Sequence, residues 1–378
     1  MKRVILMAVA LFAVLATAED GFAGRLLLRL GPQERVRAGG AGIDVGTYSV
    51  PSFTDWDNDG KKDLIVGAKD GKVRIYINEG SESNPLFSTP LYAQSNGADL
   101  IRTGAGCMGC FPRVVYWDAD GGKDLLIGRS DGKVEIFLNV AGDNAPAFDG
   151  GTLLKVGASG SKTNIGVGAR ATPSVVDWNS DGKKDLAVGA YDGKIHLFIN
   201  EGTDAEPDFR AETFAPEDGS DLFVSAMRSS PDCLDLDGDG DKDLLMGNTS
   251  GQLLFYSNTG TDADPNFSGY QAVESDGVAI DLTASRSRPF ACDWTSDGYF
   301  DVLIGASDGK VYLYQSIPQQ GDMDKDYDVD GDDFAVFALM WGASGCGACG
   351  GADLAGGDAA VDMRDLLEFA TFWLAGTQ

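Results

Sequence analysis

Residues on which many enzymes and nucleic-acid-binding proteins rely are scarce in this chain. It has one histidine, His196, among 378 residues, and 30 lysines and arginines stand against 58 aspartates and glutamates, a formal net charge of −28. His196 lies in the alternating segment KIHLFIN, which predicts a strand residue rather than a base, so a Ser-His-Asp triad has little support. The negative charge argues against nucleic acid and anionic lipid as partners, because both would be repelled.

Long hydrophobic runs are also lacking, so the sequence predicts no membrane span. The first residues carry a different signal: Lys2 and Arg3 precede an apolar run from Val4 to Ala16, and small residues follow up to Ala18. This pattern is typical of a secretory signal peptide. We expect residues 1–18 to be removed and the mature protein to be exported, to the extracellular space, the cell surface or the periplasm.

Cysteine is sparse, with six residues in the chain. Two Cys-x-x-Cys pairs and two single cysteines are far apart in sequence, and export favours disulfides over a zinc site. Several pairings are possible, and we favour one in which the two single cysteines, which precede acidic loops of adjacent repeats, pair with each other. The expected bonds are Cys107 with Cys110, Cys346 with Cys349, and Cys233 with Cys292.

An acidic nonapeptide that recurs five times dominates what the sequence does contain. It reads DWDNDGKKD from Asp55 and returns from Tyr116, Asp177, Asp235 and Asp293, at a pitch of 61, 61, 58 and 58 residues. A proline always stands four residues ahead of it. Repetition at this period predicts a solenoid or a propeller.

A single repeat unit has the content of a propeller blade. Residues 63–68 are apolar and β-branched, Asp70-Gly71 is a two-residue turn signal, and residues 72–78 alternate, which together predict a β-hairpin. Strands around residues 50–54 and 86–93 bring the unit to four strands.

The ends of the array indicate how the ring closes. The fifth hairpin runs directly into Pro318 without an outer strand, while an unpaired segment that contains RLLLRL precedes the first unit. If residues 25–30 form the missing outer strand, no sheet edge is left open. We therefore predict an all-β, five-bladed β-propeller over residues 19–317, closed by an N-terminal strand.

The five acidic loops predict calcium sites. Closely packed carboxylates repel one another unless a cation lies among them, and oxygen atoms at loop positions 1, 3, 5 and 9 suit a hard cation such as Ca²⁺. The second loop has Tyr116 at position 1 and is expected to be the weakest site. The expected ligands are Asp55, Asp57, Asp59 and Asp63; Asp118, Asp120 and Asp124; Asp177, Asn179, Asp181 and Asp185; Asp235, Asp237, Asp239 and Asp243; and Asp293, Thr295, Asp297 and Asp301.

Over about residues 45–316 these loops and hairpins resemble the calcium-binding repeats called FG-GAP or VCBS, which occur in integrin-type and bacterial propellers. The resemblance implies calcium-stabilised blades.

The C-terminal residues 321–378, after a short linker at 318–320, differ in kind. Five aspartates occupy positions 1, 3, 5, 9 and 12 of an EF-hand-like loop, and a helix follows. In a second, degraded copy, counting back from Asp365 and Asp362 puts Leu354 at position 1, and Asp353 substitutes only if that loop has an extra residue. The expected ligands are Asp322, Asp324, Asp326, Asp330 and Asp333.

This duplicated arrangement resembles a type I dockerin, a small α-helical, EF-hand-like module. The resemblance implies calcium in the tail and a cohesin-like protein partner. We expect aromatic residues of the two helices, Phe334, Phe337 and Trp341 with Leu366, Phe369 and Trp373, to pack against each other.

Two further sets of recurrent residues are candidate ligand sites. Arginines three residues before the strand proline, together with aspartates before an apolar residue, either form sugar-binding clusters between blades or pair to tie the blades together. Tryptophans at loop position 2 are either sugar platforms or inter-blade packing. The sets are Arg170, Arg228, Arg286, Asp221 and Asp281, and Trp56, Trp117, Trp178 and Trp294.

Three classes of function remain open. The leading one is a non-enzymatic, calcium-binding propeller that binds carbohydrate or protein and is recruited through its tail. The second is a carbohydrate-active enzyme, a glycoside hydrolase or polysaccharide lyase as catalytic or accessory subunit, by analogy of fold alone. The third is a structural or adhesive surface protein.

Overall fold

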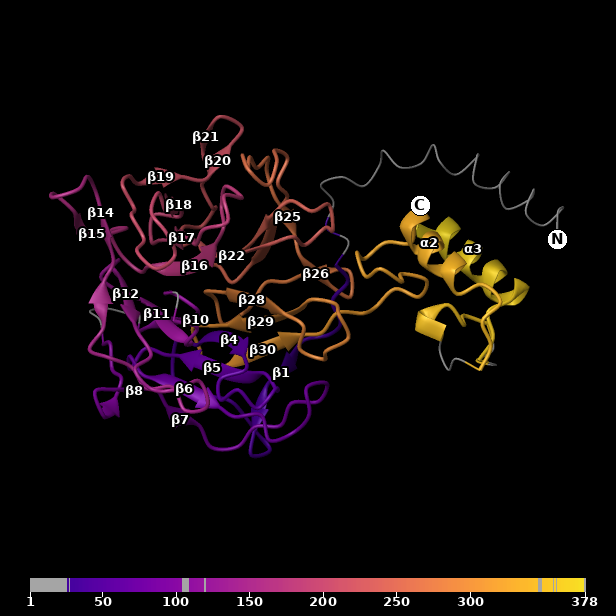
Figure 1. Cartoon of the computed structure of the whole chain (residues 1–378), viewed down its shortest axis with the longest axis horizontal. Coiled ribbons are helices and arrows are strands. Elements are labelled where there is room, and N and C mark those ends of the chain that lie inside the picture. The colour runs from indigo at the N-terminus through magenta and orange to yellow at the C-terminus, as the bar shows by residue number, and fades with distance from the viewer. Residues whose placement is uncertain are drawn as a thin grey trace. The chain divides into compact units, whose positions relative to one another are not determined.

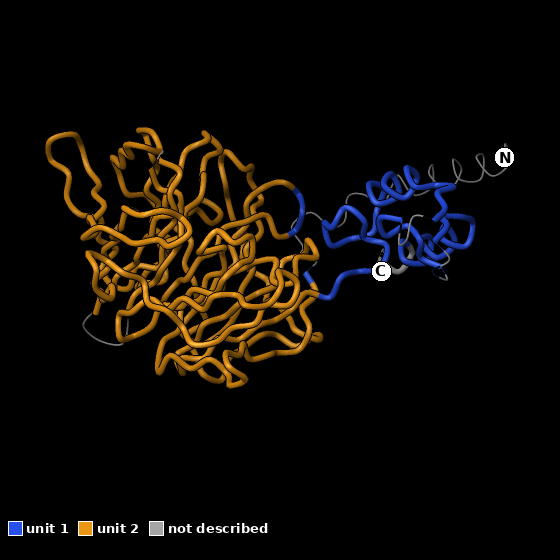
Figure 2. The backbone as a smooth tube through the Cα atoms, turned by 60° about the horizontal axis from the view of Figure 1, so that its bottom comes forward, with its two compact units in different colours: residues 1–28, 237–239, 317–378 blue, residues 29–236, 240–316 orange. Residues whose placement is uncertain are grey.

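The computed structural model describes residues 26, 28–103, 109–118, 120–345, 349–355, 357 and 359–376. The chain divides into two compact units (Figure 2), one of residues 29–236 and 240–316, the other containing the C-terminal residues 317–378 and the loop residues 237–239. In the part of the chain that is described, no helix is long and apolar enough to cross a membrane.

The larger unit is a propeller of five four-stranded antiparallel sheets, as the sequence predicts (Figure 1). The acidic loop of each repeat joins the first two strands, and the Asp-Gly or Ser-Gly turn joins the second to the third. The strands, from the innermost outward, are β4 Val50–Thr54, β5 Asp63–Gly67, β6 Val73–Tyr76 and β7 Leu91–Tyr92 in blade 1; β10 Phe111–Val115, β11 Asp124–Gly128, β12 Val134–Phe137 and β13 Thr152–Leu153 in blade 2; β16 Thr172–Val176, β17 Asp185–Gly189, β18 Ile195–Phe198 and β19 Thr213–Phe214 in blade 3; β22 Ser230–Leu234, β23 Asp243–Gly247, β24 Leu253–Tyr256 and β25 Gln271–Ala272 in blade 4; and β28 Arg288–Cys292, β29 Asp301–Gly305, β30 Val311–Tyr314 and β1 Glu34–Arg35 in blade 5.

A two-stranded hairpin follows each outer strand and pairs with the next blade. In blade 1, for example, Ser95 forms a parallel bridge with Phe148 of blade 2. These hairpins are β2 Arg37–Ala38 with β3 Ala41–Gly42, β8 Gln94–Ser95 with β9 Ala98–Asp99, β14 Lys155–Val156 with β15 Thr163–Asn164, β20 Pro216–Glu217 with β21 Ser220–Asp221, and β26 Glu274–Ser275 with β27 Val278–Ala279.

The recurring glycine and proline explain how closely the blades approach. A Cβ atom placed on Gly67 would lie 2.4 Å from both the Cys110 carbonyl oxygen and the Pro112 ring of blade 2, so no side chain fits there. The same contact repeats between all neighbours, the last and first blades included. The remaining pairs are Gly128 with Pro173, Gly189 with Pro231, Gly247 with Pro289, and Gly305 with Pro51.

The tryptophans at loop position 2 pack between blades instead of standing on the surface. All four are buried, and each contacts a phenylalanine of the following blade. This favours inter-blade packing over sugar platforms. The ring pairs, with centroid distances, are Trp56 with Phe148 at 5.8 Å, Trp117 with Phe209 at 6.4 Å, Trp178 with Phe267 at 6.1 Å, and Trp294 with Phe87 at 5.7 Å.

The N-terminal segment closes the ring, but five residues later than expected. β1 pairs with β30, with Glu34 opposite Leu313, and Leu30 bridges Ser316. Leu30 thereby takes the place of the phenylalanines that bridge an asparagine in the other blades, such as Phe87 with Asn78. The predicted outer strand at 25–30 is therefore wrong in register, because among the described residues the pairing with blade 5 runs from Leu30 to Arg35.

The favoured bond between Cys233 and Cys292 is wrong, since both thiols are free. Cys233 is the fourth residue of β22 and Cys292 the fifth of β28. Neighbouring positions of a strand face opposite sides, so the two side chains diverge. Cys233 packs in the core between blades 3 and 4, and Cys292 in the core between blades 5 and 1.

The other two expected disulfides involve the Cys-x-x-Cys pairs. Cys110 is free and buried in the core between blades 1 and 2, where its thiol donates to the Lys72 carbonyl at 3.4 Å, so a bond to Cys107 is also wrong. Cys349 is disulfide-bonded. Cys107 and Cys346 lie outside the described residues.

The smaller unit contains two helices, α2 Gly331–Leu339 and α3 Met363–Gly376, and a short 3₁₀ turn, η1 Cys349–Gly351. Its core is aromatic, as expected: Phe369 lies 5.4 Å from Phe337 and 5.9 Å from Phe334, centroid to centroid. Trp373 joins them at 5.8 Å from Phe369. Trp341 differs from the prediction, because it contacts Phe337 but stays 44% exposed.

Candidate metal centre

The aspartate at loop position 9 is the structural anchor of every acidic loop. In blade 3, one Asp185 carboxylate oxygen accepts from the Trp178 N–H at 2.9 Å, and the other accepts from the Asn200 N–H at 2.7 Å. Burial raises the pKa of Asp185, while those two N–H groups oppose the shift. The equivalent residues Asp63, Asp124, Asp243 and Asp301 are also fully buried and accept the same two bonds.

This anchor leads to a prediction for Asp185→Ala. Two buried N–H groups would lose their acceptors, so we expect the free energy of unfolding to fall by about 2 to 4 kcal/mol even in excess chelator. Urea denaturation measures it, with Asp181→Ala as control, because exposed Asp181 pairs only with Lys183 and neighbouring loop groups and should change stability by about 0.5 kcal/mol or less. Equal midpoints for the two variants would refute the anchoring role.

The first loop gathers three of its four predicted ligands. One carboxylate oxygen from each of Asp55, Asp57 and Asp63 lies within 4.8 Å of the other two. Asp55 Oδ1 and Asp57 Oδ1 are buried without a hydrogen-bond partner. Burial raises the pKa of Asp63 to about 6, and the charges of Asp57 and Asp55 add to the shift. Asp59 instead pairs with Lys61 Nζ at 2.8 Å.

A buried carboxylate oxygen without a donor costs free energy, and a cation relieves both that cost and the repulsion between the three groups. The donor set of the first loop, oxygen atoms alone, fits Ca²⁺.

Three other loops hold their carboxylates largely through their own backbone. In the third loop both Asp177 oxygens accept N–H groups, from Asp181 at 3.0 Å and Gly182 at 2.8 Å, and Asn179 also accepts from Asp181. The fifth loop repeats the first two of these bonds at Asp293 and leaves Thr295 Oγ1 buried without a partner. In the second loop, Asp118 accepts from Asp120, and Asp120 from Gly122.

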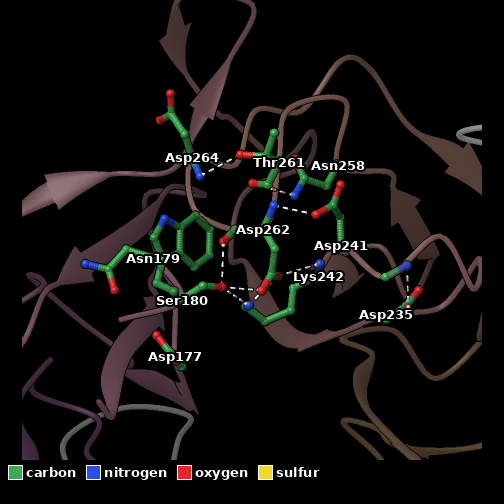
Figure 3. Close-up of polar contacts among 12 residues, drawn as sticks. Asp177, Asn179, Ser180, Asp235, Asp241, Lys242, Asn258, Thr261, Asp262 and Asp264 are labelled. Atoms are coloured by element: carbon green, nitrogen blue, oxygen red, sulfur yellow. Dashed lines mark hydrogen bonds and ion pairs between the residues drawn. The ribbon is translucent and has the colours of Figure 1, made fainter. Parts of the chain in front are cut away.

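The fourth loop is tied to the third through Asp262, a residue that the sequence patterns did not single out (Figure 3). Asp262 accepts from the Lys242 N–H at 3.1 Å, contacts Lys242 Nζ, and accepts from the Ser180 hydroxyl of the third loop. Asp143 accepts from the Lys123 N–H and Asp204 from the Lys184 N–H in the same way. The spacing of 61 residues from Asp143 to Asp204 and of 58 from Asp204 to Asp262 matches the pitch of the repeat and could have identified these residues in the sequence.

Within the fourth loop, Asp235 accepts from Gly240 at 3.0 Å. Asp237 and Asp239 belong to the segment that groups with the smaller unit, and their role as ligands stays a prediction.

Among the described residues, the first tail loop forms the largest group of neighbouring carboxylates. Carboxylate oxygens of Asp322, Asp324, Asp326 and Asp333 lie within 4.8 Å of one another. Burial raises the pKa of Asp333 to about 8 and that of Asp326 to about 6, and neighbouring carboxylates add to both shifts. Asp330, the fifth predicted ligand, caps α2 by accepting from the Asp332 N–H at 2.8 Å.

Asp328 was missed because position 7 of such loops ordinarily contributes its backbone carbonyl. Its carboxylate groups with those of Asp326 and Asp330, its Oδ1 is buried without a partner, and burial raises its pKa to about 7.

The second tail loop contains the extra residue. Asp365 Oδ1 accepts from the N–H groups of Leu354 and Ala355, as Asp333 Oδ1 accepts from Met323 and Asp324. The residue before Leu354, Asp353, is thus equivalent to Asp322, and placing Leu354 at position 1 is wrong. Asp353 Oδ1 is buried without a partner, so this loop also presents an acceptor suited to a cation.

The structure gives the recurrent aspartates and arginines separate contacts, and their role as ligand residues stays a prediction. Lys194 forms an ion pair with Asp221 at 2.6 Å, and the backbone of Asp281 forms an antiparallel β-bridge with that of Gln252. Arg170, Arg228 and Arg286 line a common cavity with Arg288, and neither of these aspartates is among its lining residues. His196 is buried in β18, where it contacts Glu212 and Asp192.

No protein-family model and no curated protein matches this chain. Among solved structures it is similar to part of the Tc holotoxin pore of Photorhabdus luminescens, with 13% identity and a TM-score of 0.36 over 75% of this chain and only 12% of the toxin chain. It is also similar to BBS1N in a complex with ARL6DN, with 11% identity and a TM-score of 0.40 over 78% of this chain and 98% of that chain. At such low scores the fold assignment rests on the sheet topology of this chain.

Proposed function

We propose that this chain is an exported, calcium-stabilised propeller of the FG-GAP/VCBS type that binds a carbohydrate or protein ligand without catalysis. A dockerin-like tail recruits it to a cohesin-like partner. A rigid closed ring presents its surface without rearrangement, which suits a binding module.

The observation that carries the calcium proposal is the set of buried carboxylate oxygens that lack a hydrogen-bond donor. Most buried polar atoms in proteins are paired, so each such exception indicates a missing partner. Here they occur inside acidic loops of both units, where Ca²⁺ is the fitting partner. They are Asp55 Oδ1, Asp57 Oδ1, Asp328 Oδ1 and Asp353 Oδ1.

The tail proposal is supported by apolar residues on the surface of α3. Met363 and Leu367 are 53% and 71% exposed and lie four residues apart, so they share one helix face. Exposed apolar residues on one face are typical of a docking surface.

Binding of the propeller is tested on a glycan array with and without chelator. We expect calcium-dependent retention of at least one glycan class and no release of reducing sugar. Sugar release would replace the proposal with a carbohydrate-active enzyme, and no retention would leave the adhesive or structural class.

The tail is tested separately, by pull-down of the full chain with purified cohesin modules. We expect capture in calcium and its loss in Asp322→Ala, while Arg210→Gln on the propeller surface, 56% exposed, retains it. Failure of every cohesin to bind would remove the adaptor role and leave the propeller proposal standing.

A further inference from the structure

An arginine cluster surrounds a small cavity at one end of the innermost strands. The cavity has a volume of about 20 Å³ and is lined by residues of blades 2 to 5, four of them arginines. No aspartate or glutamate occurs among its described lining residues. Four arginines that line one cavity are unexpected in a chain with a net charge of −28. The lining arginines are Arg170, Arg228, Arg286 and Arg288.

The cluster is desolvated and self-repelling. Arg288 is only 4% exposed, and burial lowers its pKa to about 9, with further lowering by the charges of Arg286, Arg170 and Arg228. Arg228 Nη1 is buried without a hydrogen-bond partner. An unpaired donor beside like charges is the environment that an anion stabilises.

Aromatic rings hold the guanidinium groups in place. Arg228 and Arg170 each lie 5.2 Å from the Tyr191 ring centroid, and Arg286 lies 4.7 Å from that of Tyr48. Arg286 also donates to the Tyr48 hydroxyl, whereas Arg228 Nη1 has no acceptor and is the donor that a ligand would satisfy.

The backbone is strained at the same places. Arg170, Arg228 and Arg286 stand three residues before the strand prolines and have φ of 63°, 62° and 63°. Residues with side chains seldom adopt this left-handed conformation, and such strain concentrates at ligand sites. Tyr48, the equivalent residue of blade 1, has φ of 58°, so the unfavourable geometry recurs around the ring and three of these positions carry an arginine.

The site is separate from the acidic loops. Arg170, Arg228 and Arg286 precede the innermost strands and Arg288 is the first residue of one, while the loops follow these strands, so a strand of five residues, roughly 17 Å, separates cluster and loops. The negative loops therefore do not neutralise the cluster directly.

We propose that this cluster is an oxyanion-binding site, which takes a carboxylate, sulfate or phosphate group. A cavity of about 20 Å³ admits one small group and not a whole sugar ring. The ligand therefore inserts its anionic group while the rest of it stays at the surface. This deepens the proposed binding function by naming the chemistry of the ligand, and it holds whether or not the loops bind calcium.

The test uses the full chain in calcium at constant ionic strength, with chloride partly replaced by millimolar sulfate, phosphate or acetate. We expect sulfate or phosphate to raise the melting temperature of the wild type, and titration calorimetry to show at least tenfold weaker binding for Arg228→Gln and Arg286→Gln. Arg210→Gln removes one positive charge from an exposed arginine that pairs with Glu201 and Asp208, and it should bind like the wild type.

Trigalacturonate distinguishes the source of the group. Binding tenfold tighter than acetate indicates a carboxylate carried by an acidic glycan, and equal binding indicates a free anion. If the anions change the melting temperature and bind equally in the wild type, Arg228→Gln and Arg286→Gln, the proposal is overturned. Because calcium is present throughout, that failure leaves the calcium-dependent melt, and with it the proposed function, untouched.

Discussion

Removal of calcium should lower the melting temperature of the propeller by about 3 to 10 °C. Extracellular calcium sites have dissociation constants near 0.1 to 1 mM, so at millimolar calcium each contributes about 0.4 to 1.4 kcal/mol, and four sites sum to about 2 to 6 kcal/mol. For a ring of this size that range converts to the stated temperature shift. Calorimetric melts in calcium and in excess chelator measure it.

Two loop variants make the calcium prediction specific. Asp57→Ala should lose the contribution of one site in calcium but cost nothing in chelator, because Asp57 Oδ1 has no partner and its charge repels Asp63. Asp118→Ala, in the loop that begins with Tyr116, should change the calcium response little. A calcium response identical in the wild type and Asp57→Ala would contradict a site in the first loop.

Deletion of residues 19–46 should abolish cooperative folding of the propeller. The deletion removes β1 and exposes the edge of β30, and it takes away the buried side chains of Leu30, Val36 and Ile43. Burial of each contributes about 1.5 to 3 kcal/mol, so the sum is comparable to the entire net stability of a domain. We expect aggregation, which light scattering measures, or loss of the melting transition, which calorimetry measures.

A shorter deletion is the control. A chain that begins at Leu28 keeps the buried Leu28, Leu30 and β1 and should melt like the wild type, because the described pairing with blade 5 runs from Leu30 to Arg35. A soluble, equally stable chain without residues 19–46 would rule out closure by the N-terminal strand.

The blades could be predicted because their signals are local. The turn at Asp70-Gly71, the alternation after it and the strict pitch each depend on residues close in sequence, and their repetition fixed the number of blades. The register of closure could not be predicted, because Leu30 and Ser316 replace the phenylalanine and asparagine that bridge in the other blades.

Side-chain direction and insertions were the other limits. The predicted bond between Cys233 and Cys292 rested only on the loops that the two cysteines precede. Cys233 is the fourth residue of its strand and Cys292 the fifth, and this difference of one position turns the two thiols to opposite sides. Asp353 could be assigned only once the bonds to Asp365 showed where the extra residue lies. Spacing singled out Arg170, Arg228 and Arg286, but it gave no sign that Arg288 lines the same cavity or that Lys194 pairs with Asp221.

Anomalous diffraction from crystals grown in millimolar calcium tests the central claim most directly. We expect a calcium peak in the first loop, bonded to Asp57 Oδ1 and Asp55 Oδ1 at about 2.3 to 2.6 Å, and another among Asp322, Asp324, Asp326 and Asp333. Water molecules or a lysine Nζ at both places, with no anomalous signal, would contradict it.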